Sequence, residues 1–251
     1  MQCDEKWAFV GKKEANCDPN NPDDERQGDH WDHVALDAEH RLVLSVVPGK
    51  RTAENVQALL QDVKKRLDGR TPNLITTDEY PAYKTAVLQA FGEEMVPEPT
   101  GKPGRPRDPL FVPKPELNYA VVHKTREKGR VTKVDFRVIF GTMVSVAAAL
   151  ALSHASKAIN TAFIERQNGS DRNRNGRKVR KTYCFSKDWE VHQAATYFTM
   201  YSYNFCWPVL TLRQRGPDDR WQARTPAMTA GLTDHVWPLS EWLSYPSVQR
   251  K

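Results

Sequence analysis

The stretch that decides the fold reads HWDHVALDAEHRLVLSVVPG and spans residues 30–49. Aromatic and β-branched residues dominate His30–Leu36 and Arg41–Val47, a composition typical of strands. The segment between them, Asp37–His40, has the length of a hairpin connection, and Pro48-Gly49 ends the second strand. The sequence therefore predicts an antiparallel hairpin near the start of the chain.

A helix and another strand follow this hairpin. Apolar residues recur at helical spacing from Ala53 to Leu67, with Thr52 as the N-cap and Gly69 as the stop signal. Asn73–Thr77 is a short β-branched strand, and Pro81 opens a second helix. The predicted order downstream of the hairpin is thus helix, strand, helix.

One more strand, Lys6–Val10, precedes the hairpin. Three antiparallel strands, a helical crossover and a parallel strand match the ribonuclease-H-like fold. We therefore expect an α/β protein with a mixed sheet, three antiparallel strands and then parallel strands, flanked by helices. Further extended segments are expected at Leu117–His123 and Val131–Phe140. Helices are expected at Asn160–Asn168, Ser186–Tyr203 and Leu239–Leu243, with a loop at Val96–Pro115 and Met143–Ala158 left open.

Composition limits the classes of protein to which the chain can belong. It has 251 residues, a net charge of +6 and 39% hydrophobic residues. A basic surplus favours nucleic acid or an anionic membrane surface as partner. The longest apolar stretch, Met143–Leu152, is too short to span a bilayer, and no leader opens the chain, so we expect a soluble cytosolic protein. The cysteines lack Cys-x-x-Cys spacing, which argues against a zinc site.

Three acidic residues each stand in a motif of their own. Asp4 lies in CDEKW, Asp78 in ITTDEY and Glu165 in AFIERQN. The first two adjoin strands and the third lies in a helical pattern, so a sheet with a helix packed on it can bring them together. Three carboxylates at one point bind divalent cations, and two such metals catalyse phosphoryl transfer on nucleic acids.

Each acid also has an ordinary structural interpretation. Asp4, followed by Glu5, fits a turn before a strand, and Asp78 fits a helix N-cap. Glu79 is adjacent and could take the role of Asp78. Glu165 could be a surface residue beside a counter-charge. From the residues alone, these alternatives stay open.

Basic residues crowd the segment after the third acid: Arg172, Arg174, Arg177, Lys178, Arg180 and Lys181. Such a run usually forms a solvated loop, but directly after a catalytic helix it could neutralise DNA phosphates. A second, weaker basic loop holds Lys102, Arg105 and Arg107. Tryptophans could stack on bases, although core packing is their commoner role: Trp189, Trp207, Trp221, Trp237 and Trp242.

These motifs, taken in order, resemble those of DDE transposases of small prokaryotic insertion elements, the insertion-sequence-one type and its relatives. The resemblance extends over most of the chain. The stretches that carry it are DEKW at 4–7, FVGKK at 9–13, VALD at 34–37, GKRTA at 49–53, ITTD at 75–78, TAFIERQN at 161–168, YNFC at 203–206 and TPAM at 225–228.

The resemblance implies a ribonuclease-H-like catalytic domain over residues 1–205, followed by a partly irregular extension over 206–251. Because the first candidate acid is at position 4, we expect the N-terminal DNA-binding module to be absent. It implies cutting and joining of element ends by a catalytic, metal-binding triad of Asp4, Asp78 and Glu165, with two Mg²⁺ ions for which Mn²⁺ can substitute. Asn168 and Arg172 take supporting, DNA-binding positions. The implied partner is double-stranded DNA, of element ends and target, bound by a homo-oligomer at a prokaryotic nucleoid.

Two stretches depart from the family pattern. Gly169-Ser170-Asp171 follow Asn168, where such transposases continue a helix, so a helix break is expected there. Trp207-Pro208-Val209 follow the YNFC motif, where a basic, histidine-bearing stretch is usual. The alternative functions are a decayed or domesticated element that only binds DNA, and a structure-specific nuclease on the same fold.

Overall fold

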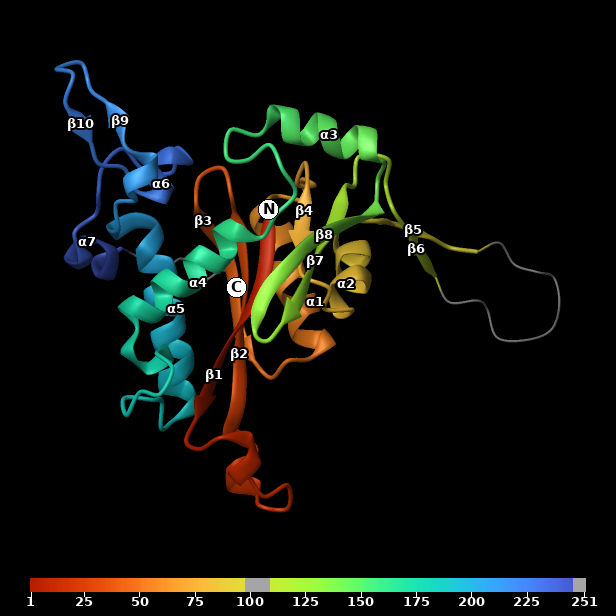
Figure 1. Cartoon of the computed structure of the whole chain (residues 1–251). Helices are drawn as coiled ribbons and strands as arrows, with labels where there is room; N and C mark the ends of the chain where they lie inside the picture. Colours follow the sequence, from red (N-terminus) through yellow and green to blue (C-terminus); the bar gives the residue numbers. More distant parts are fainter. Residues whose placement is uncertain (98–108, 246–251) are drawn as a thin grey trace.

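The computed structural model describes residues 1–97 and 109–245 (Figure 1). At its centre is a six-stranded sheet in the order β3-β2-β1-β4-β7-β8. Strands β1, β2 and β3 pair antiparallel, β4 lies parallel to both β1 and β7, and β8 is antiparallel to β7. The strands are β1 (Gln2–Val10), β2 (Gly28–Asp37), β3 (Leu42–Gly49), β4 (Ile75–Thr77), β7 (Tyr119–Glu127) and β8 (Arg130–Phe140).

Helices cover both faces of this sheet (Figure 1). On one face, two helices pack around buried residues such as Leu60 and form the larger core cluster. On the other face, two helices pack around Ile164 and Met200. In the same order, the helices are α1 (Ala53–Arg66), α2 (Ala82–Phe91), α4 (Ala162–Arg174) and α5 (Trp189–Cys206). The expectation of an α/β protein with a mixed sheet flanked by helices is confirmed.

The first helix follows the predicted signals. The Thr52 side chain accepts a hydrogen bond from the Asn55 amide at 3.4 Å, which satisfies one of the free N–H groups of the first turn. Buried apolar residues recur along one side of α1 and face the sheet. Gly69, with φ of +75°, sits in the left-handed region just after the helix, which a residue without Cβ adopts without strain.

Two predicted boundaries are wrong, and both errors bear on the candidate acids. Strand β1 begins at Gln2 rather than Lys6, so Asp4 lies inside a strand and not in a turn before it. Helix α4 continues through Gly169 to Arg174 rather than breaking after Asn168. A glycine inside a helix costs about 1 kcal/mol relative to alanine, and buried contacts further along α4, at Asp171, offset this cost.

The predicted loop at Val96–Pro115 is also wrong in part. Strand β5 (Glu93–Met95) pairs antiparallel with β6 (Leu110–Val112). The basic loop residues Lys102, Arg105 and Arg107 lie outside the described residues. The segment left open contains α3 (Met143–Leu152), which begins with a capping box between Thr142 and Ser145.

Smaller elements complete the chain. After α5 come η4 (Leu210–Leu212), β9 (Gln214–Arg215), β10 (Trp221–Gln222), α6 (Pro226–Thr229) and α7 (Leu239–Ser244), the last confirming the predicted short helix. Single 3-10 turns lie at η1 (Glu14–Asn16), η2 (Pro22–Asp24) and η3 (Gly176–Lys178). Across residues 1–97 and 109–245, no helix combines the length and apolar character needed to cross a membrane.

The core between α1 and the sheet predicts a specific stability difference. Leu60 is fully buried, so Leu60→Ala should lower the free energy of unfolding by about 2–5 kcal/mol through lost burial and a residual cavity. Leu152→Ala, the same change at a side chain that is 72% exposed, should shift it by no more than about 0.5 kcal/mol. Urea unfolding of both variants measures the difference, and equal losses would contradict this packing.

Candidate active site

Two of the three predicted acids lie side by side on neighbouring strands. In the parallel pair β1–β4, Gln2 is opposite Thr76. Asp4 lies two positions further along β1 and projects from the same face as Gln2. Asp78 directly follows β4, and its charge acts on Asp4. The carboxyl end of β4 therefore brings Asp78 next to Asp4, as the strand pattern predicted.

The environment of Asp4 disfavours its negative charge. Burial, together with the charges of Asp78 and Glu5, raises the pKa of Asp4 to about 7. The Asn168 amide Nδ2 donates a hydrogen bond to Asp4 Oδ2 at 2.8 Å and partly opposes this shift. Near neutral pH, Asp4 is thus a carboxyl group poised between its two protonation states, which a bound cation would drive to the charged form.

Asp78 occupies a turn rather than a helix cap. Its Oδ1 accepts a hydrogen bond from the Tyr80 amide at 3.1 Å, whereas α2 begins later, after Pro81. Its Oδ2 lies 4.0 Å from Arg51 Nη2. The neighbouring Glu79 is engaged elsewhere, by His123 and by Arg137, so it does not compete for the position beside Asp4.

Arg51 links this site to the opposite face of β1. Its guanidinium donates to Glu5 Oε2, with Nη2 at 3.0 Å, and lies over the Tyr80 ring at 4.2 Å from the centroid. Glu5 is buried, and burial raises its pKa. Arg51 therefore balances two acids at once, Glu5 and Asp78, from the loop just before α1.

Helix α4 is fixed on the sheet by three contacts with alternate residues of β1. Gln2 Oε1 accepts hydrogen bonds from the amides of Phe163 and Ile164, both at 3.0 Å. Asp4 accepts from Asn168, and the Lys6 ammonium pairs with Asp171. We call these contacts the β1–α4 ladder. Residues 2, 4 and 6 share one face of the strand. The ladder therefore fixes the position of α4 along the length of β1.

Glu165 lies on α4 between the first and second contacts of the ladder. Its Oε1 accepts a hydrogen bond from Thr161 at 2.5 Å and pairs with the Lys124 ammonium of β7. Its side chain is 46% exposed. Glu165 therefore faces the same side of the sheet as Asp4 and Asp78, but one of its oxygens is held by a lysine.

The last contact of the ladder belongs to a buried ionic network. Lys6 Nζ also lies 3.2 Å from Asp32 Oδ2, with both side chains fully buried. The Lys178 ammonium pairs with the same oxygen. Burial would raise the pKa of Asp32, but Lys178 and Lys6 hold it well below the usual range. With Asp171, two lysines balance two aspartates inside the protein.

This network changes the assignment of the basic segment. Lys178 is 3% exposed and pairs with Asp32, so it does not face solvent and leaves the set of DNA-contacting residues. Asn168 is likewise buried against Asp4. Arg180 and Lys181 are exposed. Arg172 is half-buried, and among the described residues its Nε has no hydrogen-bond partner.

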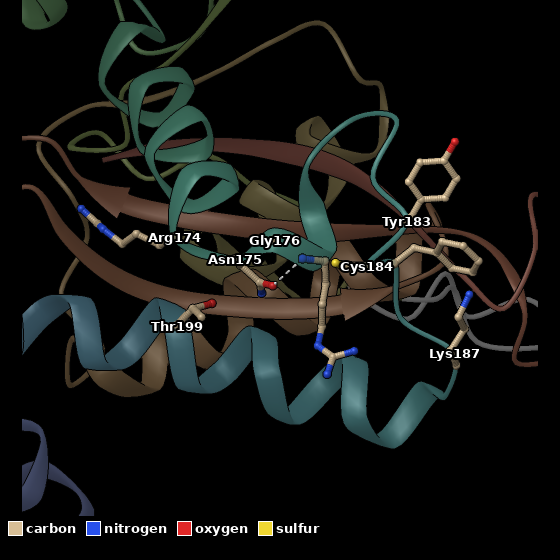
Figure 2. Close-up of a pocket in the computed structure, with 9 residues that line it drawn as sticks. Arg174, Asn175, Gly176, Tyr183, Cys184, Lys187 and Thr199 are labelled. Carbon is tan, nitrogen blue, oxygen red and sulfur yellow. Dashed lines mark hydrogen bonds between the residues drawn. The ribbon is translucent and has the colours of Figure 1, made fainter.

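The remaining basic residues border a hollow beside η3 and α5 (Figure 2). Its volume is about 450 Å³, and its lining includes Arg174, Arg177 and Lys187. Arg174 and Lys187 lie at opposite ends of it in Figure 2. The Arg174 guanidinium lies over the rings of Tyr203 and Trp207. Arg177 also borders the hollow, and the Lys187 ammonium lies over the Phe185 ring.

The site meets part of what a divalent cation requires. Asp4 and Asp78 offer carboxylate oxygens, and Asn168 Oδ1 is buried without a hydrogen-bond donor in the described part of the chain. Over the same residues, no three Asp, Glu, His or Cys side chains are already grouped to hold a metal ion. The aspartate pair fits a hard cation, whereas Glu165 Oε1 is already engaged by Thr161 and Lys124.

Several residues of this site escaped the sequence analysis. Arg51 lies in the GKRTA stretch, which was used only as part of the family resemblance and was assigned no role. Lys124 lies in a strand that contains no motif. Lys6 and Asp171 form a pair across 165 positions, and no local pattern signals such a contact. Comparison of the chain with protein-family models, curated proteins and solved structures found no match.

The raised pKa of Asp4 predicts a pH-dependent stability in chelator. Since folding raises this pKa from 3.8 to about 7, the native state binds more protons in that interval, and stability falls as pH rises through it. Asp4→Asn should remove this loss and raise the midpoint temperature above pH 7 by several degrees, at about 2–4 °C per kcal/mol. Thermal unfolding from pH 4 to 8 measures it. Asp135→Asn, at a half-exposed carboxylate that pairs with Lys133, is the control, and parallel pH profiles of wild type and Asp4→Asn would contradict the prediction.

The β1–α4 ladder predicts strong coupling between Lys6 and Asp171. Lys6→Met leaves buried aspartates short of a cation and should cost about 3–5 kcal/mol of stability. Lys6→Met combined with Asp171→Leu removes the uncompensated charge and should recover most of the loss, because Lys178 still pairs with Asp32. Urea unfolding of the single and double variants measures the coupling. Purely additive losses would show that the pair does not hold α4 to β1.

Proposed function

We propose that this chain is a DDE transposase, a polynucleotidyl transferase that cuts and joins the ends of an insertion element. The sheet order supports the proposal. Antiparallel β1–β3 are followed by parallel β4 and β7 beside β1, the arrangement expected of a ribonuclease-H-like domain. In such an arrangement β1 and β4 deliver acids to one point at the centre of the sheet.

The observation that carries the proposal is the Asp4–Asp78 pair under α4. Two acids at close range, one of them with a pKa raised to about 7 by burial and by its neighbours, are electrostatically unfavourable without a partner. Carboxylates whose pKa is perturbed by burial and by a neighbouring acid are frequent at functional sites. A divalent cation is the partner that oxygen ligands of this geometry prefer.

The residues of the site then have distinct roles. Asp4 and Asp78 would hold a cation, and Glu165 would complete the set of ligands on leaving Lys124. Asn168 orients the Asp4 carboxylate through its Nδ2 hydrogen bond. Arg172, half-buried on α4 after Asn168, takes the supporting position that the resemblance implies. Bound Mg²⁺, or Mn²⁺ in its place, would activate the attacking oxygen and stabilise the leaving one.

Double-stranded DNA is the substrate that this surface suits. The exposed Arg180 and Lys181, with Arg177 and Lys187 around the hollow, lie on the chain directly after α4. Neutralising phosphates near the carboxylates would position the scissile bond and make binding strongly dependent on salt. A homo-oligomer that holds two element ends would act on this DNA.

One observation favours a second candidate function. Glu165 is paired with Lys124 and half-exposed, as expected of an acid that no longer binds metal. A domesticated remnant that binds DNA without cutting it would retain the basic surface and this ion pair. A nuclease on the same fold would cut but not join, so joining of labelled flanking DNA to a target duplex separates it from a transposase.

Replacement of Asp78 tests the catalytic role. Asp78→Asn should lower Mg²⁺- or Mn²⁺-dependent nicking of supercoiled DNA by more than about 100-fold, since even changes beyond the direct ligands of a metal cost about 10–100-fold. DNA binding in chelator, followed by fluorescence anisotropy, should stay close to wild type. Asp135→Asn, on the exposed β8 strand, is the matched control and should cut normally. Undiminished nicking by Asp78→Asn would refute the assignment.

A further inference from the structure

The hairpin of β9 and β10 projects from the body of the molecule beside α6 (Figure 1). Trp221 pairs with Arg215 and Gln222 with Gln214. All four residues are exposed. A two-stranded ribbon this short buries almost nothing of its own, so its sequence is free to serve a contact outside the chain.

One face of the ribbon concentrates positive charge around an aromatic ring. Arg213 and Arg215 are two positions apart, and Trp221 is the cross-strand partner of Arg215. The two guanidinium carbons lie 4.2 Å and 4.6 Å from the centre of the Trp221 ring. This ring is 51% exposed. Cation–π contacts therefore hold two long side chains in place beforehand, which lowers the entropy lost when they bind a ligand.

The base of the hairpin is anchored to the domain. Arg224 donates to Gln214 Oε1 at 2.8 Å and to the Met228 carbonyl of α6 at 3.1 Å. The Val209 amide donates to the Arg224 carbonyl at 3.0 Å. The direction in which the ribbon points is thus fixed by the body of the protein rather than by a free linker.

The charge of the ribbon remains positive after its acids are counted. Residues 208–225 hold four arginines and two aspartates, a net charge of 4 − 2 = +2. Arg215 pairs with Asp219 at 3.2 Å and Arg220 with Asp218 at 3.7 Å, in exposed positions. Exposed pairs of this kind contribute little, so phosphate groups can displace them.

We propose that the β9–β10 hairpin is a second DNA-binding element, which lays its Arg213–Arg215–Trp221 face in a groove of duplex DNA. A two-stranded ribbon fits the major groove, which is about 12 Å wide. Alternate residues of a strand are about 6.6 Å apart, close to two steps of one DNA strand at about 3.4 Å each. The inference rests on the proposed function only in taking duplex DNA as the partner; it does not require the chain to cut DNA.

The salt dependence of binding tests this proposal. Binding of the full chain to a fluorescein-labelled duplex of mixed sequence is measured by anisotropy in chelator over a range of salt concentrations. Loss of two phosphate contacts in Arg213→Gln/Arg215→Gln should make the plot of log K against log[salt] shallower by about 1.8, at about 0.9 per contact. Binding should therefore be weaker at low salt and converge with wild type at high salt.

The matched control removes the same charge elsewhere. Lys65→Gln/Arg70→Gln changes two exposed residues at the end of α1 and should leave the slope unchanged. An unchanged slope in the hairpin variant, an equal change in the control, or an effect confined to single-stranded DNA would overturn the proposal. A shallower slope in a protein that never nicks DNA would refute the catalytic proposal and leave this one standing. Normal nicking by a protein whose hairpin variant has an unchanged slope would refute the hairpin proposal and leave the catalytic proposal standing.

Discussion

The β1–α4 ladder is the constraint on which the site depends. Gln2, Asp4 and Lys6 each contact α4 from one face of β1. A strand rises about 3.3 Å per residue and a helix about 1.5 Å, so contacts at successive steps along both elements permit few relative positions. Once α4 is held there, Glu165 lies on the same side of the sheet as Asp4 and is paired with Lys124 of β7. The geometry of the proposed site depends on this register.

The ladder carries an energetic cost and lies next to the Asp4–Asp78 pair of the proposed metal site. The interior carries two lysines and two aspartates, where apolar residues of similar size would often be more stable. These ion pairs fix the position of α4 on β1, because an ion pair with hydrogen bonds sets a distance that apolar packing leaves adjustable. Asp4 is held by a hydrogen bond from Asn168, and its pKa is raised by burial and by the charges of Asp78 and Glu5. A cation that binds there would offset part of the cost of burying this charge.

Local sequence predicted the elements that depend on local signals. The α1 helix carries its cap, its apolar spacing and its terminal glycine within residues 52–69, and Asp78 could be expected at a strand end. What depends on distant partners was not predictable. The extension of β1 to Gln2 and of α4 past Gly169 needs contacts between these two elements. Lys178 looked like its basic neighbours in sequence, and only the position of η3 beside Asp32 buries it.

The most direct measurement is anomalous scattering from crystals of the protein grown with Mn²⁺. Since the ladder holds the acids on one face, the account predicts Mn²⁺ bound by Asp4 and Asp78, with Glu165 turned from Lys124 toward the ion. Crystals of the Lys6→Met/Asp171→Leu variant, which lacks the third contact of the ladder, should show weaker or displaced anomalous signal from Mn²⁺ at this site. Mn²⁺ bound elsewhere, with Asp4 and Asp78 free of it at saturating concentration, would contradict the account.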